Sequence, residues 1–284
     1  MSYRSPVMHE SLPPGAERRV LRLSRGDLAA TRCDGGGDPV VIVPGYFGSK
    51  EDFWPLFPGL AAAGYDAWSF DQLGQYDSGG PDDPAHYTVD LLARDLNEVL
   101  AHVGGDRPVH LVGHCLGGFI ARTLTLATPE RVASLTLLAC GPALHGRRHR
   151  MMLHGYSGYL KNGGPHDTVS RRIEKMILEG AGPWFAHTRD KMQRAKFGFL
   201  WGMAHSACDE PDRTAELKAT GVPMFVLYGS IGGRLWSRRD LADMAGQLGA
   251  PSHMVHDSAH HPAMEQPADT TEALVRFFAG TGAA

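Results

Sequence analysis

Residues 109–122 have the sequence Val109-His-Leu-Val-Gly-His-Cys-Leu-Gly-Gly-Phe-Ile-Ala-Arg122, which combines a strand, a sharp turn and a helix. The run 109–112 is short and apolar, as in a buried strand, and the residues from Leu116 onward favour a helix. In the turn between them, glycines stand two residues before and two residues after Cys115. Small residues at those places let the backbone bend tightly enough to present the cysteine at the end of the strand. The helix N-terminus that follows favours a thiolate and offers a backbone N–H to an anion.

Strand and helix patterns alternate on both sides of this segment, from about residue 17 to residue 279. Strand, helix and strand in succession imply parallel pairing, so we expect one α/β domain with a mostly parallel sheet of about eight strands. The expected elements are a hairpin at 19–24 and 28–33, strands at 39–43, 66–70, 109–112, 133–138, 224–228 and 253–256, and helices at 53–63, 88–103, 116–126, 237–248 and 269–278. Residues 1–16 hold several prolines and are expected to form a flexible lead-in.

The alternation is interrupted once, between residues 141 and 208, so the core is expected to comprise residues 17–140 and 209–284. The interruption carries eleven Lys and Arg against four Asp and Glu, and it is rich in Met, Trp, Phe and Gly. This composition suits a helical lid, inserted in the same domain, that covers an apolar cavity. Its basic residues, among them Arg147, Arg148 and Arg150, form either an ordinary solvated face or a contact for an anionic substrate.

The Gly-x-Cys-x-Gly turn resembles the nucleophile elbow of the α/β-hydrolase superfamily, with Cys115 where a serine usually stands. The resemblance extends from about residue 19 to residue 280 and implies the α/β-hydrolase fold. A dinucleotide-binding loop is excluded because the G-x-G-x-x-G pattern would require a glycine at position 115. A buried cysteine with only a packing role is the alternative interpretation of the motif.

Two further segments carry the resemblance. Residues 43–49, Val-Pro-Gly-Tyr-Phe-Gly-Ser, are similar to the family's loop after the third strand. This match implies an oxyanion hole made by the backbone N–H groups of Tyr46 and Leu116. Residues 71–78 resemble the family's Asp-x-x-Gly-x-Gly-x-Ser turn, with Tyr76 in place of the second glycine.

The base that the resemblance implies lies near the C-terminus. Residues 258–267 have the sequence Ser-Ala-His-His-Pro-Ala-Met-Glu-Gln-Pro and are similar to the family's histidine loop. The family's catalytic histidine usually stands five residues before a glutamate, and Glu265 selects His260 by this spacing. His261 is the alternative base.

The carboxylate that usually completes the family's triad is missing from its expected place. The family has a Gly-x-x-Asp turn after the seventh strand, and Gly232 stands where the aspartate would be. The alternative position after the sixth strand holds Cys140-Gly-Pro, without a carboxylate. Asp240 and Asp257 can substitute only if their loops differ from the family's. Because a thiol ionises more readily than a hydroxyl, a Cys–His dyad could hold a thiolate without the acid.

Composition and charge exclude several classes. The formal net charge of −3 gives no overall attraction to nucleic acid. No run approaches the roughly 18 apolar residues of a membrane span and no secretory signal is evident, so we expect a cytoplasmic protein without a membrane partner. The cysteines are far apart and form no C-x-x-C pair, which argues against a disulfide framework and a cysteine-based zinc site. His145 and His149 have a metal-binding spacing without a third ligand, so neither a metal nor an organic cofactor is expected.

These observations predict an acyl-transfer enzyme in which Cys115 attacks an activated acyl group and His260 moves the proton. Attack of a cysteine on a thioester exchanges bonds of equal energy, whereas attack on an oxygen ester forms a bond of higher energy. Thioesters of coenzyme A or of an acyl carrier protein are therefore the expected donors, and water, an alcohol, an amine or an internal nucleophile is the acceptor.

Two other classes of function stay open at this point. One is a binding protein on a hydrolase fold whose triad has decayed. The other is a cofactor-free lyase or cyclase that uses the oxyanion hole and His260 without a covalent intermediate. Among enzymes, the Gly-x-Cys-x-Gly motif resembles both dienelactone hydrolases and polyhydroxyalkanoate synthases, while a single chain with a lid is closer to ordinary hydrolases and thioesterases.

Overall fold

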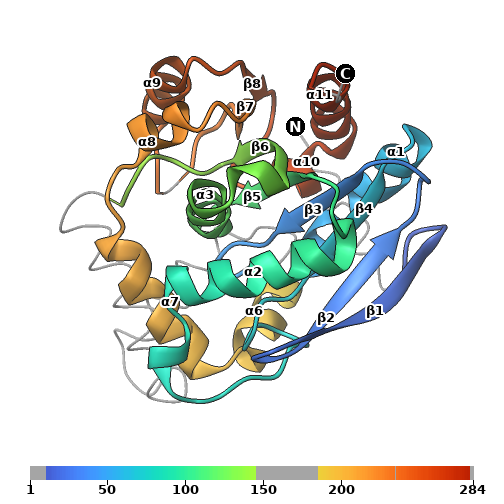
Figure 1. Cartoon of the computed structure of the whole chain (residues 1–284), viewed down its shortest axis with the longest axis vertical. Coiled ribbons are helices and arrows are strands. Elements are labelled where there is room, and N and C mark those ends of the chain that lie inside the picture. The colour runs from blue at the N-terminus through green and yellow to red at the C-terminus, as the bar shows by residue number, and fades with distance from the viewer. Residues whose placement is uncertain (1–10, 145–184, 234, 282–284) are drawn as a thin grey trace.

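The computed structural model of the chain describes residues 11–144, 185–233 and 235–281 (Figure 1). Eight strands form one sheet in the order β1-β2-β4-β3-β5-β6-β7-β8. Their bounds are β1 Ala16–Leu23, β2 Gly26–Cys33, β3 Pro39–Val43, β4 Asp66–Phe70, β5 Val109–His114, β6 Val132–Leu138, β7 Met224–Gly229 and β8 Ser252–Val255. The hairpin β1–β2 joins β4 in antiparallel fashion, and all other neighbours are parallel. The predicted eight-stranded, mostly parallel sheet is thus confirmed.

Helices cover both faces of the sheet, and each face has its own apolar core (Figure 1). The helices are α1 Phe57–Ala62, α2 Val89–Gly104, α3 Gly117–Ala127, α6 Phe185–Arg194, α7 Phe197–Asp209, α8 Thr214–Ala219, α9 Arg238–Leu248, α10 Pro262–Glu265 and α11 Pro267–Ala279, with 3-10 helices η1 Lys50–Leu56, η2 Pro84–His86 and η3 Pro129–Arg131. Leu96 of α2, Phe119 of α3 and Leu241 of α9 belong to one core. Phe53 of η1 and Phe278 of α11 belong to the other. None of the helices in these ranges has the length and apolar character needed to cross a bilayer.

The helix predicted over residues 53–63 forms as two shorter elements, η1 and α1. Pro55 lies inside η1, and Pro58 lies in the first turn of α1. A proline has no N–H for the helical ladder, but it is tolerated in the first turn, where that donor would have no partner. The chain therefore starts a new helix at Phe57 instead of continuing one.

The described part of the predicted insertion contains α6 and α7; residues 145–184 lie outside the described residues, as do residues 1–10 of the predicted lead-in. Helix α7 packs very closely on the segment that contains η2. A Cβ atom added at Gly198 would lie 2.5 Å from the carbonyl oxygen of Asp82, and one at Gly202 would lie 2.2 Å from that of Pro84. Both contacts are with backbone, so only glycine allows this approach. The function of the insertion as a lid stays a prediction.

Candidate active site

Cys115 lies in the turn between β5 and α3, with a φ of +52°. Such a left-handed conformation is unfavourable for a residue with a side chain, and it persists only where the surroundings hold it. The surroundings are tight here. A Cβ added at Gly113 would lie 2.5 Å from Gly118 Cα, and one at Gly117 would lie 2.4 Å from the carbonyl oxygen of Pro44. The flanking glycines of the motif are thus required by close backbone contacts.

The Cys115 side chain is buried, with 5% of its residue surface exposed. Burial raises the pKa of the thiol to about 12, although backbone N–H groups of Leu116 and Tyr46 form hydrogen bonds to the sulfur that lower it. These are the two N–H groups that the family resemblance assigns to the oxyanion hole. The direction of this shift opposes the thiolate that the motif suggests, because removal of the thiolate from water outweighs the N–H groups and the helix terminus.

The loop that carries Tyr46 is held by two glutamine side chains. Gln72 Nε2 donates to the carbonyl oxygen of Pro44 at 2.7 Å, and Gln75 Nε2 donates to that of Gly45 at 2.8 Å. Both glutamines are buried in the turn over residues 71–78. These bonds fix the carbonyl groups of the two residues that precede Tyr46. Our sequence interpretation of this turn did not assign the glutamines a role.

The same turn explains a departure from the family pattern. Tyr76, which replaces the second glycine of the pattern, has a φ of +43°. The position therefore keeps the left-handed backbone for which glycine is usually chosen. The Tyr76 side chain contacts helix α6 in two ways. Its hydroxyl donates to Asp190 at 3.1 Å, and the Arg194 guanidinium lies 4.2 Å from the ring centre. Tyr76 thus joins the turn to the inserted helix.

His260 belongs to a cluster of three histidines. The ring centres of His114, His260 and His261 lie 4.8–5.0 Å apart in each pairing. Burial, with the positive charge that His114 would add, lowers the pKa of His260 to about 3. Burial also lowers the pKa of His261 well below its ordinary value. All these rings are therefore neutral at pH 7.

His114 and Glu265 hold the loop that carries His260. His114 Nε2 lies 2.9 Å from the carbonyl oxygen of His260, so this nitrogen carries the proton and donates it. Glu265 Oε2 accepts hydrogen bonds from the hydroxyl of Ser258, at 2.7 Å, and from the N–H of Ala259. The five-residue spacing between histidine and glutamate thus has a local physical reason. No hydrogen bond joins the Cys115 sulfur and the His260 ring, both of which lie in the described part of the chain.

The two candidate substitute acids have other partners. Asp240 caps helix α9, where its carboxylate accepts from the N–H and the hydroxyl of Ser237, each at 2.8 Å. Asp257 is exposed at a left-handed turn with a φ of +53°, and its N–H donates to the hydroxyl of Ser230. Among the described residues, neither forms a hydrogen bond or an ion pair with His260. A role for either as the acid finds no support in these contacts.

The position that faces the His260 ring is 233 and not 232. A Cβ added at Gly233 would lie 3.3 Å from Nδ1 of His260. One added at Gly232, where φ is +81°, would have Arg238 Cγ as its nearest neighbour, at 3.8 Å. The alternative acid position is occupied by Cys140, whose sulfur packs under Gly118 and whose pKa burial raises to about 12.

A buried ion pair that no sequence motif indicated lies beside this site. Lys191 Nζ of α6 donates to both carboxylate oxygens of Asp52 in η1, at 2.6 and 2.8 Å, and both side chains are at most 4% exposed. The carboxylate also accepts from the N–H of Ser49 at 3.0 Å. Burial alone would raise the pKa of Asp52, but Lys191 and His187 outweigh burial and hold it well below its ordinary range. The pair anchors α6 next to the loop that carries Tyr46.

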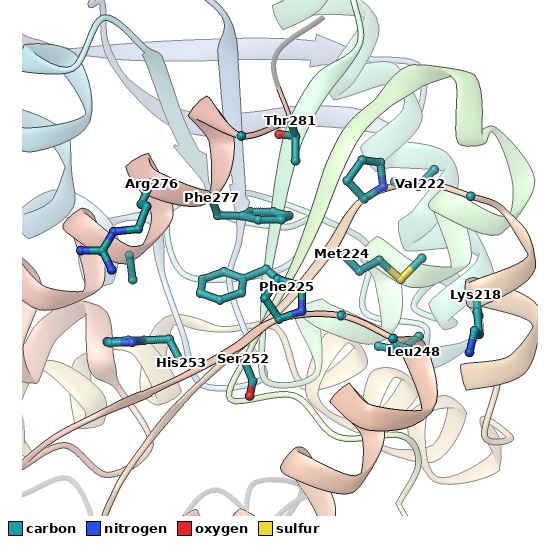
Figure 2. Close-up of a pocket in the computed structure, with 17 residues that line it drawn as sticks. Lys218, Val222, Met224, Phe225, Leu248, Ser252, His253, Arg276, Phe277 and Thr281 are labelled. Atoms are coloured by element: carbon teal, nitrogen blue, oxygen red, sulfur yellow. The ribbon is translucent and has the colours of Figure 1, made fainter.

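The larger of the two cavities described here lies at the opposite edge of the sheet. It has a volume of about 840 Å³ and lies at the amino ends of β7 and β8 (Figure 2). Met224, Phe225, Leu248 and Phe277 are among its apolar lining residues, and Lys218 and Arg276 lie on its sides. Cys115 follows the carboxyl end of β5, and the intervening strands are parallel, so this cavity is remote from the thiol. A second, much smaller cavity adjoins His260.

The described residues contain no group of three or more His, Cys, Asp or Glu that could hold a metal ion. His145, His149, Arg147, Arg148 and Arg150 lie outside the described residues.

Part of the sequence is similar to known proteins. Residues 38–162 match the sequence family described as alpha/beta hydrolase fold. A putative carbamate hydrolase, RutD of Variovorax paradoxus, is 37% identical over 102 residues, which span 36% of this chain and 38% of that protein. A fluoroacetate dehalogenase of Burkholderia is 26% identical over 257 residues, or 86% of this chain and 79% of the relative.

Solved structures extend the similarity to nearly the whole chain. A thermophilic esterase from Thermogutta terrifontis matches with a TM-score of 0.79 at 20% identity, covering 94% of this chain and all of that one. The thioesterase domain from the curacin biosynthetic pathway matches with a TM-score of 0.70 at 16% identity, covering 92% of this chain and 99% of that domain. At these identities the similarity concerns the fold. It confirms the predicted α/β-hydrolase fold.

Proposed function

On this α/β-hydrolase fold, we propose that the chain is an acyl-transfer enzyme with Cys115 as nucleophile and His260 as base. One observation carries the proposal: the sulfur lies on a left-handed turn at the end of β5, with the N–H groups of Tyr46 and Leu116 directed at it. Acyl transfer needs two such donors next to the nucleophile, because the carbonyl oxygen becomes an oxyanion when the tetrahedral intermediate forms. A cysteine with only a packing role has no need of a strained turn that presents it to two N–H groups.

The pKa directions define how this pair would react. These shifts favour a neutral thiol and a neutral His260 ring, so no ion pair between the two is expected before the substrate binds. Nε2 of His260 would take the thiol proton as the sulfur bonds to the acyl carbon. The C=O electron pair would move onto oxygen, between the N–H groups of Tyr46 and Leu116. When the intermediate collapses, the leaving thiolate would take the proton from His260, and an acyl-Cys115 would remain.

The second half-reaction would use His260 in the same way. It would accept a proton from water, an alcohol or an amine as this acceptor attacks the acyl-Cys115 carbonyl, and it would return the proton to the Cys115 sulfur. Thioesters are the proposed donors, because sulfur-to-sulfur exchange costs no bond energy. Arg147, Arg148 and Arg150 are proposed contacts for the anionic part of a coenzyme A or carrier-protein donor, on the basis of the insertion's positive charge. The thioesterase domain among the structural neighbours is consistent with this class of donor.

Mass spectrometry of the intact protein tests the proposal. We expect an acyl thioester to add the mass of one acyl group to the wild type, and Cys115→Ala to acquire none. Cys140→Ala is the matched control, because Cys140 is also a buried thiol next to α3 but does not receive the two N–H groups. An adduct that persists in Cys115→Ala, or turnover by that variant, would contradict nucleophilic catalysis by Cys115.

A binding protein is the second candidate function. The observation that favours it is the neutral, buried thiol without a hydrogen bond to His260. Such a protein would bind an acyl compound without turnover. Calorimetric titration with a non-hydrolysable thioester analogue, compared with turnover of the thioester itself, separates the two candidates.

A further inference from the structure

A small cavity adjoins the His260 ring at the carboxyl end of β7. Its volume of about 10 Å³ has room for about one water molecule. Its lining includes Tyr228, Gly229, Gly233, Trp236 and His260. Gly229 and Gly233 have no side chains, so they line the cavity only with backbone atoms.

The His260 ring presents Nδ1 toward Gly233. The Cβ position of residue 233 lies 3.3 Å from this nitrogen, so the space in front of Nδ1 is the space that a side chain at 233 would occupy. In this chain the residue is glycine, and the space stays open. Of the two candidate acids, Asp240 caps helix α9 and Asp257 lies at an exposed turn, and the described contacts join neither to His260. The ring thus faces a small cavity where a complete triad would have an acid.

We propose that this cavity binds one water molecule, which accepts a hydrogen bond from Nδ1–H of His260 and thereby orients the ring. A base can act through Nε2 only if the ring proton resides on Nδ1, and an acceptor at Nδ1 selects that tautomer. A carboxylate performs this positioning in a complete triad. Water is a neutral acceptor, so it fixes the tautomer without stabilising a charged ring. The lowered pKa of His260 agrees with a ring that no anion contacts.

The catalytic consequence of this water rests on the proposed function, whereas its effect on the tautomer does not. Gly233→Ala is the decisive variant, since its methyl group would stand 3.3 Å from Nδ1 and displace the water. Gly233 lies outside the left-handed region, and its other close neighbour is the carbonyl oxygen of Trp236 at 3.5 Å, so the backbone accepts an alanine and only the His260 ring must move, by a few tenths of an ångström. Gly233→Ser adds a hydroxyl one bond beyond that methyl position and restores an acceptor. Gly246→Ala, where nothing lies within 4 Å of the added methyl, is the control.

Two measurements compare these variants with the wild type. ¹⁵N NMR of histidine-labelled protein gives the tautomer of His260, assigned through the loss of its signals in His260→Asn. Single-turnover acylation gives the rate. We expect the Nδ1–H tautomer in the wild type, Gly233→Ser and Gly246→Ala. In Gly233→Ala we expect the other tautomer to appear and acylation to slow roughly 2- to 10-fold, the effect of one net hydrogen bond.

Two results would overturn the proposal: an Nε2–H tautomer in the wild type, or a Gly233→Ala protein whose tautomer and rate match the wild type. Failure of the proposed function is distinguishable. A wild type that is never acylated contradicts the enzyme, while the NMR comparison of Gly233→Ala with Gly233→Ser still decides whether an acceptor occupies the cavity.

Discussion

The hydroxyl of Tyr46 donates a hydrogen bond of 2.6 Å to the carbonyl oxygen of Leu200, and both residues are buried. The backbone N–H of Tyr46 is one of the two that approach the Cys115 sulfur. Leu200 lies in α7, within the insertion that the sequence analysis interpreted as a lid. One side chain therefore connects the proposed oxyanion hole to the insertion.

Removal of this hydroxyl should impair acylation more than it impairs stability. Tyr46→Phe keeps the ring in place and deletes one hydrogen bond, so the free energy of unfolding should fall by about 1 kcal/mol. If α7 positions the loop, the single-turnover rate should fall about tenfold, with little change in substrate binding. Urea unfolding and single-turnover kinetics check the two effects. Tyr87→Phe, which removes a hydroxyl that donates to the carbonyl oxygen of Pro81, is the control; an equal loss of rate in both variants would contradict the connection.

The pH dependence of acylation should follow from the lowered pKa of His260. His260 must be neutral to act as a base, and its pKa is lowered to about 3. The acid limb of the kcat/KM profile should therefore show no loss from about pH 8 down to about pH 4, whereas an unperturbed histidine would lose activity below about pH 6.5. Stopped-flow rates with a neutral thioester measure this profile. A midpoint near pH 6.5 would mean that His260 is not buried in the working enzyme.

The Cys115 thiol should react slowly with small alkylating reagents. Its pKa is raised to about 12, so only a small fraction is thiolate at pH 8, and that fraction grows tenfold for each pH unit. We expect iodoacetamide to modify Cys115 more slowly than free cysteine, with a rate that still rises above pH 9. A rate that levels off near pH 7 would indicate a resting ion pair and would restore the thiolate that the motif alone suggested.

Serine in place of Cys115 should be a far poorer nucleophile here than in an enzyme with a complete triad. A hydroxyl depends on an acid that holds the histidine, and loss of that acid reduces kcat by about 10⁴-fold in serine enzymes. We expect a deficit of that order for Cys115→Ser, and partial recovery in Cys115→Ser/Gly233→Asp, because residue 233 faces Nδ1. Gly232→Asp in the same background should give no recovery, since its Cβ is directed toward Arg238 and its φ is +81°. Recovery from position 232 instead of 233 would contradict the geometry.

The buried ion pair between Lys191 and Asp52 should make a large contribution to the stability with which α6 is held against η1. Lys191→Met leaves a buried carboxylate without its closest cation and should lower the free energy of unfolding by about 3–5 kcal/mol near pH 7. The pKa of Asp52 would then rise, so the deficit should shrink toward about pH 4 as protonation removes the unpaired charge. Urea unfolding at both pH values measures this. Arg213→Met, which breaks the exposed pair with Glu216, should lower the free energy of unfolding far less; a similar loss in both variants would contradict the argument.

The parts of this protein that could be predicted are those that depend on short stretches of sequence. The Gly-x-Cys-x-Gly turn has local steric requirements, and the alternation of apolar runs determines a parallel sheet. The spacing of His260 and Glu265 could likewise be recognised, because Glu265 holds the loop just ahead of His260. The catalytic roles of Cys115 and His260 stay predictions, as do those of the N–H groups of Tyr46 and Leu116.

The parts that could not be predicted depend on burial and on contacts between distant segments. Lys191 and Asp52 are separated by 139 residues, and neither belongs to a motif. The pKa of Cys115 depends on how completely water is excluded, which the helix terminus and the glycines do not reveal. The residue whose Cβ position lies near Nδ1 of His260 is Gly233, one residue after the position that the family pattern indicates, and the sequence alone does not reveal this.

The close contact between α7 and the segment containing η2 determines where this protein could be recombined with its relatives. Gly198 and Gly202 let two backbones touch, so a helix from another protein of this fold, with ordinary side chains at those places, would collide with the carbonyl groups of Asp82 and Pro84. A chimera that exchanges the whole interruption between β6 and β7 would thus lose its fit to the core. If the exchanged segment ends before α7, the chimera keeps both glycines and the Leu200 carbonyl group. A junction at this point is therefore suited to a design that alters the substrate range.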